Sequence, residues 1–402
     1  MVQQQQPPAE QQFEIFGGIG DPFPVLAGLR KASPVMKLPG DMNFWAAFRY
    51  DDVLRILRDP QTFSSMVDAR SMQGEKRPPT ILFDDPPIHT RMRGLLTAAF
   101  TPRMVDEQRE QIKENATRMI DGMLSEEAPD LIAHLAYPLP VMVIAGMLGV
   151  EDGDMATFKR WSDAIINNVG MALMTTEDLI PEVNAEFNEY FTERLQKLRR
   201  EPEDNLLNSL VHAVDEHGER LTDEDLLIVC RVLLVAGNET TTGLIVNAAR
   251  VFDRFPDVLP AVRERPELIP SMIEETLRYF PPFPATIRRT TKDVEIGGTT
   301  IPANERLLAM LASANHDEDQ FPDPESFIVD RDPNRHLGFG MGIHYCLGAP
   351  LARIEANIAL EVLAPRITSL KIEAAEEDAV LRPGGPVSMT IRMKHDRSTA
   401  RV

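Results

Sequence analysis

The chain has only two cysteines, Cys230 and Cys346, among 402 residues. Two cysteines are too few for a disulfide framework, and they exclude a tetrahedral zinc site built mainly from thiolates. A lone cysteine is most often a buried packing residue, and Cys230, within an apolar helical stretch, fits that interpretation. Cys346 lies in a different setting, among glycines, and needs a separate explanation.

A long uninterrupted apolar run is also missing from the sequence. The most apolar stretch, 226–236, is broken by Arg231 and is too short to cross a bilayer. The N-terminal sequence MVQQQQPPAEQQ has neither the basic region nor the apolar region of a signal peptide. These features predict a cytoplasmic protein without a membrane partner.

Positive charge is in short supply. The 42 Lys and Arg residues face 62 Asp and Glu residues, which gives a formal net charge of −20. Such an excess of negative charge favours solubility and argues against nucleic acid or an anionic membrane as a partner. A local basic patch remains compatible with this composition.

Between its two ends the sequence shows no linker, low-complexity block or internal repeat. Residues 1–14 are rich in Gln and Pro with little to bury, which predicts a disordered tail, and 395–402 are predicted to form a flexible one. Length alone would suggest two or three domains. We nevertheless predict that residues 15–394 form a single domain.

Helical patterns dominate this domain. Residues 222–255 predict one long helix, with Thr222 as N-cap, acids in the first turn and Pro256 as the stop. Strand patterns are few, so the predicted fold class is mainly α with a minor β region. The other predicted elements are helices at 270–280 and 347–363, a hairpin at 293–302, a strand at 305–312 that extends it, and strands near Trp45 and Val387.

Cys346 ends a glycine-rich run that begins at Phe339 and precedes a predicted helix. Gly340 and Gly342 permit a tight turn and a close approach of the backbone. N–H groups at a helix N-terminus stabilise a thiolate, so Cys346 could serve as a metal ligand or as a nucleophile. A nucleophile needs a histidine base, and His344 is too near in sequence to be assigned that role.

The run Phe339-Gly340-x-Gly342-x-His344-x-Cys346-Leu347-Gly348 resembles the haem-binding loop of the cytochrome P450 monooxygenases. The resemblance implies the P450 fold, with a long central helix over haem b and a small mixed or antiparallel β subdomain. It also implies that Cys346 is the thiolate ligand of the haem iron, with Phe339 and Gly340 beside the cofactor. Thiolate donation to iron promotes cleavage of the O–O bond.

A second motif lies at the centre of the long predicted helix, where Ala236-Gly237-Asn238-Glu239-Thr240 combines small residues with an acid and an alcohol. An acid and hydroxyl groups within an apolar helix are costly unless they have partners. The segment resembles the oxygen-activation groove of the same family. By that resemblance Ala236 and Gly237 leave room for O2. Thr240 hydrogen-bonds the bound oxygen and Glu239 relays protons, so these two are the predicted catalytic residues.

A third motif, Glu275-x-x-Arg278, lies on the predicted helix that two prolines end. By spacing alone it is an ordinary i, i+3 ion pair of a helix surface. In its place between the other two motifs it resembles the buried Glu–Arg pair of the family, and Arg331 is the predicted third member. The implied role is structural, to brace the cysteine loop.

Haem carries two propionates, which need cationic or hydrogen-bonding partners when they are partly buried. By resemblance, the predicted partners are His89, Arg93, Arg288 and His336. His89 and Arg93 are one helical turn apart and could face one way together. Arg288 is preferred to its neighbour Arg289 because of its spacing to the hairpin.

The resemblance implies a monooxygenase that activates O2 with two electrons and inserts one oxygen atom into a C–H or C=C bond. The chain ends soon after the helix behind Cys346, so electrons are expected from a separate ferredoxin and its reductase. A basic patch that includes Arg103 and Arg335 is expected where the acidic ferredoxin docks. The protein is expected to be a monomer.

The substrate pocket implied by the resemblance includes Val235, Ala236, Ile287 and Val387. The implied lining comes from the long helix and from segments 66–82, 167–174, 284–287 and 386–388. These segments are rich in Met, Leu, Ile, Val and Pro, which suits a medium-sized apolar substrate such as a terpenoid, fatty acid, steroid or polyketide. Two alternatives stay open, a peroxide-driven peroxygenase of the same family and a haem-thiolate sensor or binding protein without turnover. The pair Glu239–Thr240 argues against both.

Overall fold

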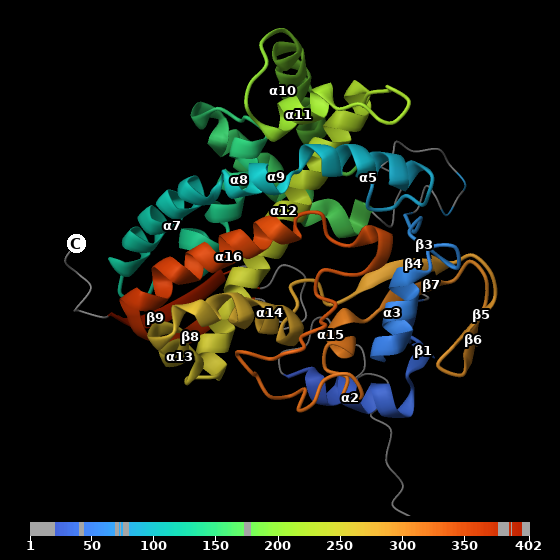
Figure 1. The fold of residues 1–402 in the computed structure, drawn as a ribbon, viewed down its shortest axis with the longest axis vertical. Helices are drawn as coiled ribbons and strands as arrows, with labels where there is room; N and C mark the ends of the chain where they lie inside the picture. The colour runs from blue at the N-terminus through green and yellow to red at the C-terminus, as the bar shows by residue number, and fades with distance from the viewer. Residues whose placement is uncertain are drawn as a thin grey trace, which may run out of the picture.

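The computed structural model describes residues 21–39, 44–68, 72, 74, 80–172, 178–376, 386 and 388–395. Helices make up most of this part of the chain (Figure 1). Most strands lie together on the right of the view, and one longer pair lies at the lower left. The predicted mainly α fold with a minor β region is therefore confirmed. The predicted tails lie outside the described residues, except that His395 is the last residue of β9 (Ser388–His395).

The central element is α12 (Asp223–Arg254), the long helix predicted from the sequence. The Thr222 side chain accepts a hydrogen bond from the Asp225 N–H, and the Asp225 carboxylate accepts one from the Thr222 N–H, which completes a capping box. Among the described helices α12 alone is long and apolar enough to cross a membrane. Half of its apolar window is buried inside the protein, as in a core helix.

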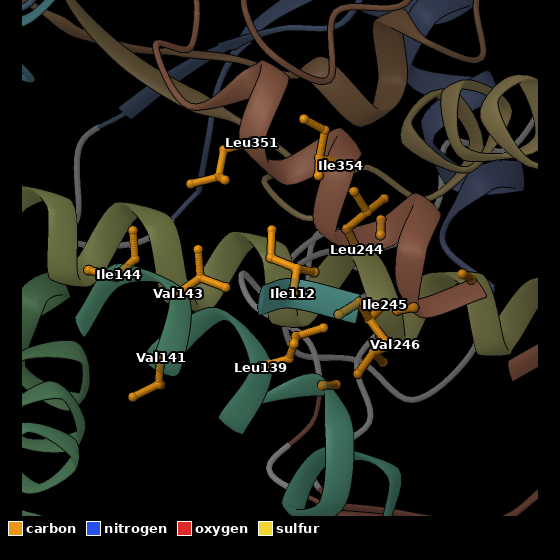
Figure 2. Packing of buried hydrophobic residues seen from close by; sticks show 14 of the residues in the cluster. Ile112, Leu139, Val141, Val143, Ile144, Leu244, Ile245, Val246, Leu351 and Ile354 are labelled. Carbon is orange, nitrogen blue, oxygen red and sulfur yellow. The ribbon is translucent and has the colours of Figure 1, made fainter. Parts of the chain in front are cut away.

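Helix α12 packs between α8 (Pro138–Met147) and α16 (Ala349–Leu363), as Figure 2 shows. Each aliphatic side chain that is fully buried in such a core contributes about 1.5–3 kcal/mol to folding. The buried residues at this junction are Leu139, Val143, Ile144, Leu244, Ile245, Leu351 and Ile354.

Other helices surround this core in chain order. The helix predicted at 270–280 is α14 (Ile269–Tyr279), and the one predicted after Cys346 is α16, each within two residues of expectation. Besides short 3₁₀ turns, the other described helices are α2 (Phe23–Ala32), α3 (Tyr50–Arg58), α5 (Ile88–Ala99), α6 (Pro102–Asp106), α7 (Arg109–Leu124), a π-helix (Ile132–Ala136), α9 (Met155–Ala172), α10 (Pro181–Arg200), α11 (Leu206–His212), α13 (Val258–Glu264) and α15 (Leu311–Ala314).

The largest sheet of the described residues has the strand order β1-β2-β7-β4-β3. Strand β2 runs parallel to β7, and the other neighbours are antiparallel. Its strands are β1 (Val35–Lys37), β2 (Phe44–Ala47), β3 (Phe63–Ser64), β4 (Thr286–Thr290) and β7 (Arg306–Ala309).

Two antiparallel pairs complete the β region. The predicted hairpin is confirmed as β5 (Val294–Ile296) and β6 (Thr299–Ile301), and β8 (Ile367–Glu376) pairs with β9. The prediction that 305–312 extends the hairpin is wrong, because β7 pairs with β2 and β4 instead. The chain turns at Asn304, where φ is +64° and the N–H donates to the Thr290 carbonyl, and this turn directs β7 along β4.

Candidate active site

The cysteine loop forms a tight turn, as its glycines predict. Cys346 lies between a 3₁₀ turn (Gly342–His344) and α16, and its N–H donates to the Phe339 carbonyl at 3.0 Å. Gly340 and Gly342 have φ values of +68° and +75°, which disfavour any residue with a Cβ. A Cβ at Gly342 would also overlap the carbonyl oxygen of Leu57. The sulfur is therefore presented by a loop that only glycine at these positions allows.

The thiol of Cys346 is held among positive groups. Burial raises its pKa, while the backbone N–H groups of Gly348 and Ala349 and the charges of Arg93 and Arg353 act in the opposite direction. Burial prevails, so the net pKa of the Cys346 thiol is raised. A metal cation bound at the sulfur would add to these positive groups and stabilise the thiolate. The fully buried thiol of Cys230 also has its pKa raised by burial, to about 12. What distinguishes Cys346 is its place in a glycine-rich loop just before the N-terminus of α16.

At the centre of α12 one face is left open. Ala236 is exposed and Val235, Glu239 and Thr240 are partly exposed, although the next turns of the helix toward its C-terminus are buried almost all round. The Thr240 hydroxyl donates to the Ala236 carbonyl oxygen at 2.7 Å. Since this bond uses the only hydroxyl proton, the Thr240 oxygen is left to accept a hydrogen bond from another group.

Four cationic or potentially cationic side chains converge from separate parts of the chain. His89 and Arg93 lie on α5, Arg288 on β4 and His344 in the cysteine loop. The rings of His89 and His344 are 4.2 Å apart, and the charge of Arg288 acts on both. We call these four residues the cationic cluster.

The electrostatics of the cationic cluster indicate an anion site. Burial, followed by the charge of Arg288, lowers the pKa of His344 to about 3. Burial lowers the pKa of Arg288 to about 10, and it also lowers the pKa values of His89 and Arg93. Both ring nitrogens of His89 are buried, and neither has a hydrogen-bond partner among the residues that the structure describes. Such orphaned polar atoms are rare in proteins, and two carboxylates would satisfy them and offset the positive charge.

The structure brings His89, Arg93 and Arg288 together as predicted but does not bring His336 into the cluster. The His336 Nδ1 accepts a hydrogen bond from the Gly338 N–H, and its Nε2 lies 3.1 Å from a carboxylate oxygen of Glu274. His344 occupies the place expected of His336. Both histidines flank the same glycine run, so sequence spacing offered no basis for choosing between them.

Glu274 and Arg353 form a second ion pair next to the cysteine loop, and this pair was not predicted from the sequence. Arg353 of α16 donates to both carboxylate oxygens of Glu274, at 2.7 and 2.8 Å. Burial raises the pKa of Glu274, but hydrogen bonds from Arg353 and His336 outweigh burial and lower it to about 2. The Arg353 guanidinium also lies 4.5 Å from the ring centroid of Phe339, so this ion pair contacts the loop directly.

The predicted Glu275–Arg278–Arg331 triad is assembled and buried. Arg278 donates to both carboxylate oxygens of Glu275 at 2.8 Å, and the side chains of both residues are fully buried. Arg331 approaches the same carboxylate at 3.0 Å. The carboxylate also accepts hydrogen bonds from the Ile328 N–H and the Asn334 side chain. These bonds attach the segment that leads to the cysteine loop to α14.

The predicted pocket residues are only partly placed. Val235 and Ala236 lie on the open face of α12, and Ile287 is partly exposed on β4, beside Arg288. Val387 lies outside the described residues, as do parts of the predicted lining at 66–82 and 167–174.

Comparison with known proteins identifies the family of this chain. A family model described as Cytochrome P450 matches residues 260–367. Cytochrome P450 109 of Bacillus spizizenii is 40% identical over 360 residues, covering 89% of this chain and 87% of that protein. The vitamin D(3) 25-hydroxylase of Pseudonocardia autotrophica is 35% identical over 392 residues, covering 95% and 96%. The crystal structure of CYP109E1 from Bacillus megaterium in complex with testosterone gives a TM-score of 0.82 at 34% identity, covering 93% and 99%.

The chain therefore belongs to the cytochrome P450 family, and its fold is the P450 fold. It is an enzyme, a cytochrome P450 monooxygenase. Family membership implies haem with a cysteine thiolate ligand and the use of O2. The residues present fit that cofactor, because Cys346 supplies the thiol and the cationic cluster supplies buried partners for two carboxylates.

A matched pair of substitutions tests the cationic cluster. Arg288 and Arg289 are adjacent on β4, but only Arg288 is almost fully buried. We expect Arg288→Gln to speed haem loss to apomyoglobin about tenfold, since a buried charge-assisted hydrogen bond contributes about 1.5–3 kcal/mol. Arg289→Gln, which removes a bond to the Asn304 side chain, should leave the rate near that of the parent protein. Equal rates for the two variants would remove Arg288 from the haem site.

Proposed function

We propose that this monooxygenase inserts one oxygen atom from O2 into a C–H bond, or a C=C bond, of a medium-sized hydrophobic substrate. The observation that carries the proposal is the open face of α12, where a hydroxyl and a carboxylate follow a small-residue notch. Haem b held by Cys346 supplies O2 activation when bound. The chain's own residues then have to position the substrate and deliver protons.

Proton delivery is assigned to Thr240 and Glu239. The Thr240 hydroxyl proton is directed to the Ala236 carbonyl, so its oxygen accepts a hydrogen bond and holds a proton donor in the groove. Glu239, partly exposed and adjacent on the helix, is the group that exchanges protons with solvent. This arrangement favours turnover with external electrons over the peroxide-driven alternative and over a sensor without turnover.

The substrate is assigned to the steroid-like or similarly sized apolar class. Val235, Ala236 and Ile287 are apolar and at least partly exposed, as the lining of an apolar pocket would be before a substrate binds. Among the relatives, one is named as a vitamin D(3) hydroxylase and one crystallised with testosterone. A terpenoid, fatty acid or polyketide of similar size fits the same chemistry, and the printed name of a further relative is mycinamicin IV hydroxylase/epoxidase.

Electrons are assigned to a separate ferredoxin and its reductase, with the protein a monomer in the cytoplasm. Arg335 is exposed at the approach to the cysteine loop, and its carbonyl accepts a hydrogen bond from Tyr50. The charges of Arg58 and Arg335 both act on that tyrosine, so two cations lie together near the loop. Arg103 is a weaker candidate, because Glu107 neutralises it through an exposed i, i+4 pair.

The proposed roles predict the effect of Thr240→Ala. We expect product formation to fall about tenfold or more and peroxide release per reductant consumed to rise, because general acid–base groups typically contribute 10²–10⁴-fold. Reduced haem protein with CO should keep its red-shifted Soret band. Thr276→Ala is the matched control, since Thr276 makes the same bond to the carbonyl four residues earlier but lies in α14.

The two alternatives give different results in the same assay. Turnover supported by hydrogen peroxide, and indifferent to Thr240→Ala, would establish the peroxygenase. Ligand-dependent spectral shifts without product, in the presence of a competent ferredoxin and reductase, would establish the sensor.

A further inference from the structure

Asn238 is the one residue of the α12 motif without a role so far. Asn238 is fully buried, and it directly precedes Glu239 and Thr240 in the sequence. A buried amide costs free energy unless its groups are hydrogen-bonded. The Asn238 Nδ2 donates to the Ser162 Oγ at 2.8 Å, and Ser162 is also fully buried, on α9. The amide thus ties the centre of α12 to another helix.

A second group of contacts lies beside Ser162 and extends to the protein surface. Tyr137, at the start of α8, donates its hydroxyl proton to Asp163 of α9. Burial, followed by that hydrogen bond, raises the pKa of Tyr137, while hydrogen bonds with Ser162 and Asn238 act in the opposite direction. Lys159 lies 2.9 Å from the Asp163 carboxylate and 4.5 Å from the Tyr137 ring centroid. We call Asn238, Ser162, Tyr137 and Asp163 the inter-helix chain.

The inter-helix chain joins three helices beside the catalytic pair. The bond between Asn238 and Ser162 is fully buried, and a hydrogen bond in a low-dielectric interior is stronger than one in water. The neighbouring backbone is close-packed as well, because a Cβ at Gly237 would lie 2.7 Å from the Ile144 Cδ1 of α8. On the far side of Thr240, the Thr242 hydroxyl donates to the Ala136 carbonyl at 3.0 Å. Contacts of Gly237, Asn238 and Thr242 with neighbouring segments therefore fix the rotation of α12 about its axis at Glu239 and Thr240.

We propose that Asn238 is a positioning residue, which holds Glu239 and Thr240 in register through Ser162 and couples that register to α9. The proposal rests on the proton-delivery role proposed above for those two residues. The last residues of α9, 167–172, belong to the segment 167–174 that the sequence predicts to line the substrate pocket. A displacement of α9 would pull on Asn238 and change the geometry of proton delivery.

Asn238→Leu and Ser162→Ala break the same bond from opposite ends. Asn247→Leu is a matched control, because Asn247 is a second buried asparagine of α12 that donates one bond, to the Phe280 carbonyl at 2.8 Å. Both asparagines also have an Oδ1 without a partner among the described residues, so the two substitutions make similar changes in polarity.

Hydrogen–deuterium exchange of the haem-loaded protein is the first measurement. We expect Asn238→Leu and Ser162→Ala to raise amide exchange about fivefold in both 155–165 and 235–242, the factor expected for one lost hydrogen bond. The double variant should match the singles, since both remove the same interaction. Asn247→Leu should leave these two segments unchanged.

The second measurement is peroxide released per reductant consumed, with surrogate ferredoxin and reductase and testosterone as probe. Peroxide release should rise roughly threefold with Asn238→Leu and not with Asn247→Leu, because misplaced proton-delivery groups lower efficiency. Exchange confined to one helix, or equal peroxide release in the two asparagine variants, would overturn the positioning role. If Thr240→Ala itself leaves peroxide release unchanged, the proton-delivery proposal fails, while the exchange result still decides whether the chain couples the helices.

Discussion

Replacement of Cys346 by serine is expected to abolish the red-shifted Soret band of the dithionite-reduced protein with CO and to reduce substrate oxidation to the detection limit. The loop geometry presents this sulfur alone, with the Gly348 and Ala349 N–H groups and Arg93 favouring the thiolate. A serine hydroxyl stays protonated near neutral pH and cannot donate electron density as a thiolate does. Absorption spectroscopy of the purified, haem-loaded variant measures the change directly.

Cys230→Ser provides the control for this experiment. Cys230 is fully buried on α12 and has no role in the cysteine loop. The variant should keep the red-shifted band, even where its stability falls. A band at the ordinary position in the parent protein, or a red-shifted band that survives Cys346→Ser, would contradict thiolate ligation by Cys346.

Glu275→Gln is expected to destabilise the protein by about 3–5 kcal/mol, the usual cost of removing one partner from a buried ion pair. Arg278 and Arg331 both depend on this carboxylate and would be left as buried cations without a countercharge. The Ile328 N–H would also face a weaker acceptor. Urea unfolding of the parent and variant proteins, followed by circular dichroism, gives the change in the free energy of unfolding.

Glu107→Gln removes a contrasting ion pair. Glu107 and Arg103 are both exposed on the surface, so solvent screens their attraction and the unfolding midpoint should not change measurably. An unfolding midpoint for Glu275→Gln as high as that of the parent would show that the buried triad does not brace the fold. Haem retention provides a second readout, because the triad ties α14 to the chain that leads to Cys346.

Much of the fold could be predicted because its signals are local. Thr222, the acids after it and Pro256 define α12 almost to the residue, and Gly297–Gly298 mark the hairpin of β5 and β6. The partner of β7 could not be predicted in this way. Strand pairing depends on where the chain turns back in space, and the turn at Asn304 places β7 beside β4 instead of β6.

The same difference between local and long-range signals applies to the candidate site. Residues whose chemistry lies within one short segment could be predicted from the sequence, namely the thiol of Cys346 among its glycines and the Glu239–Thr240 pair in α12. The three-dimensional arrangement was needed to show that His344, and not His336, joins the cationic cluster, and that Asn238 bonds Ser162. These contacts join residues on separate helices, strands and loops, and a charge cluster or a buried hydrogen bond depends on distances in space that spacing along a chain does not encode.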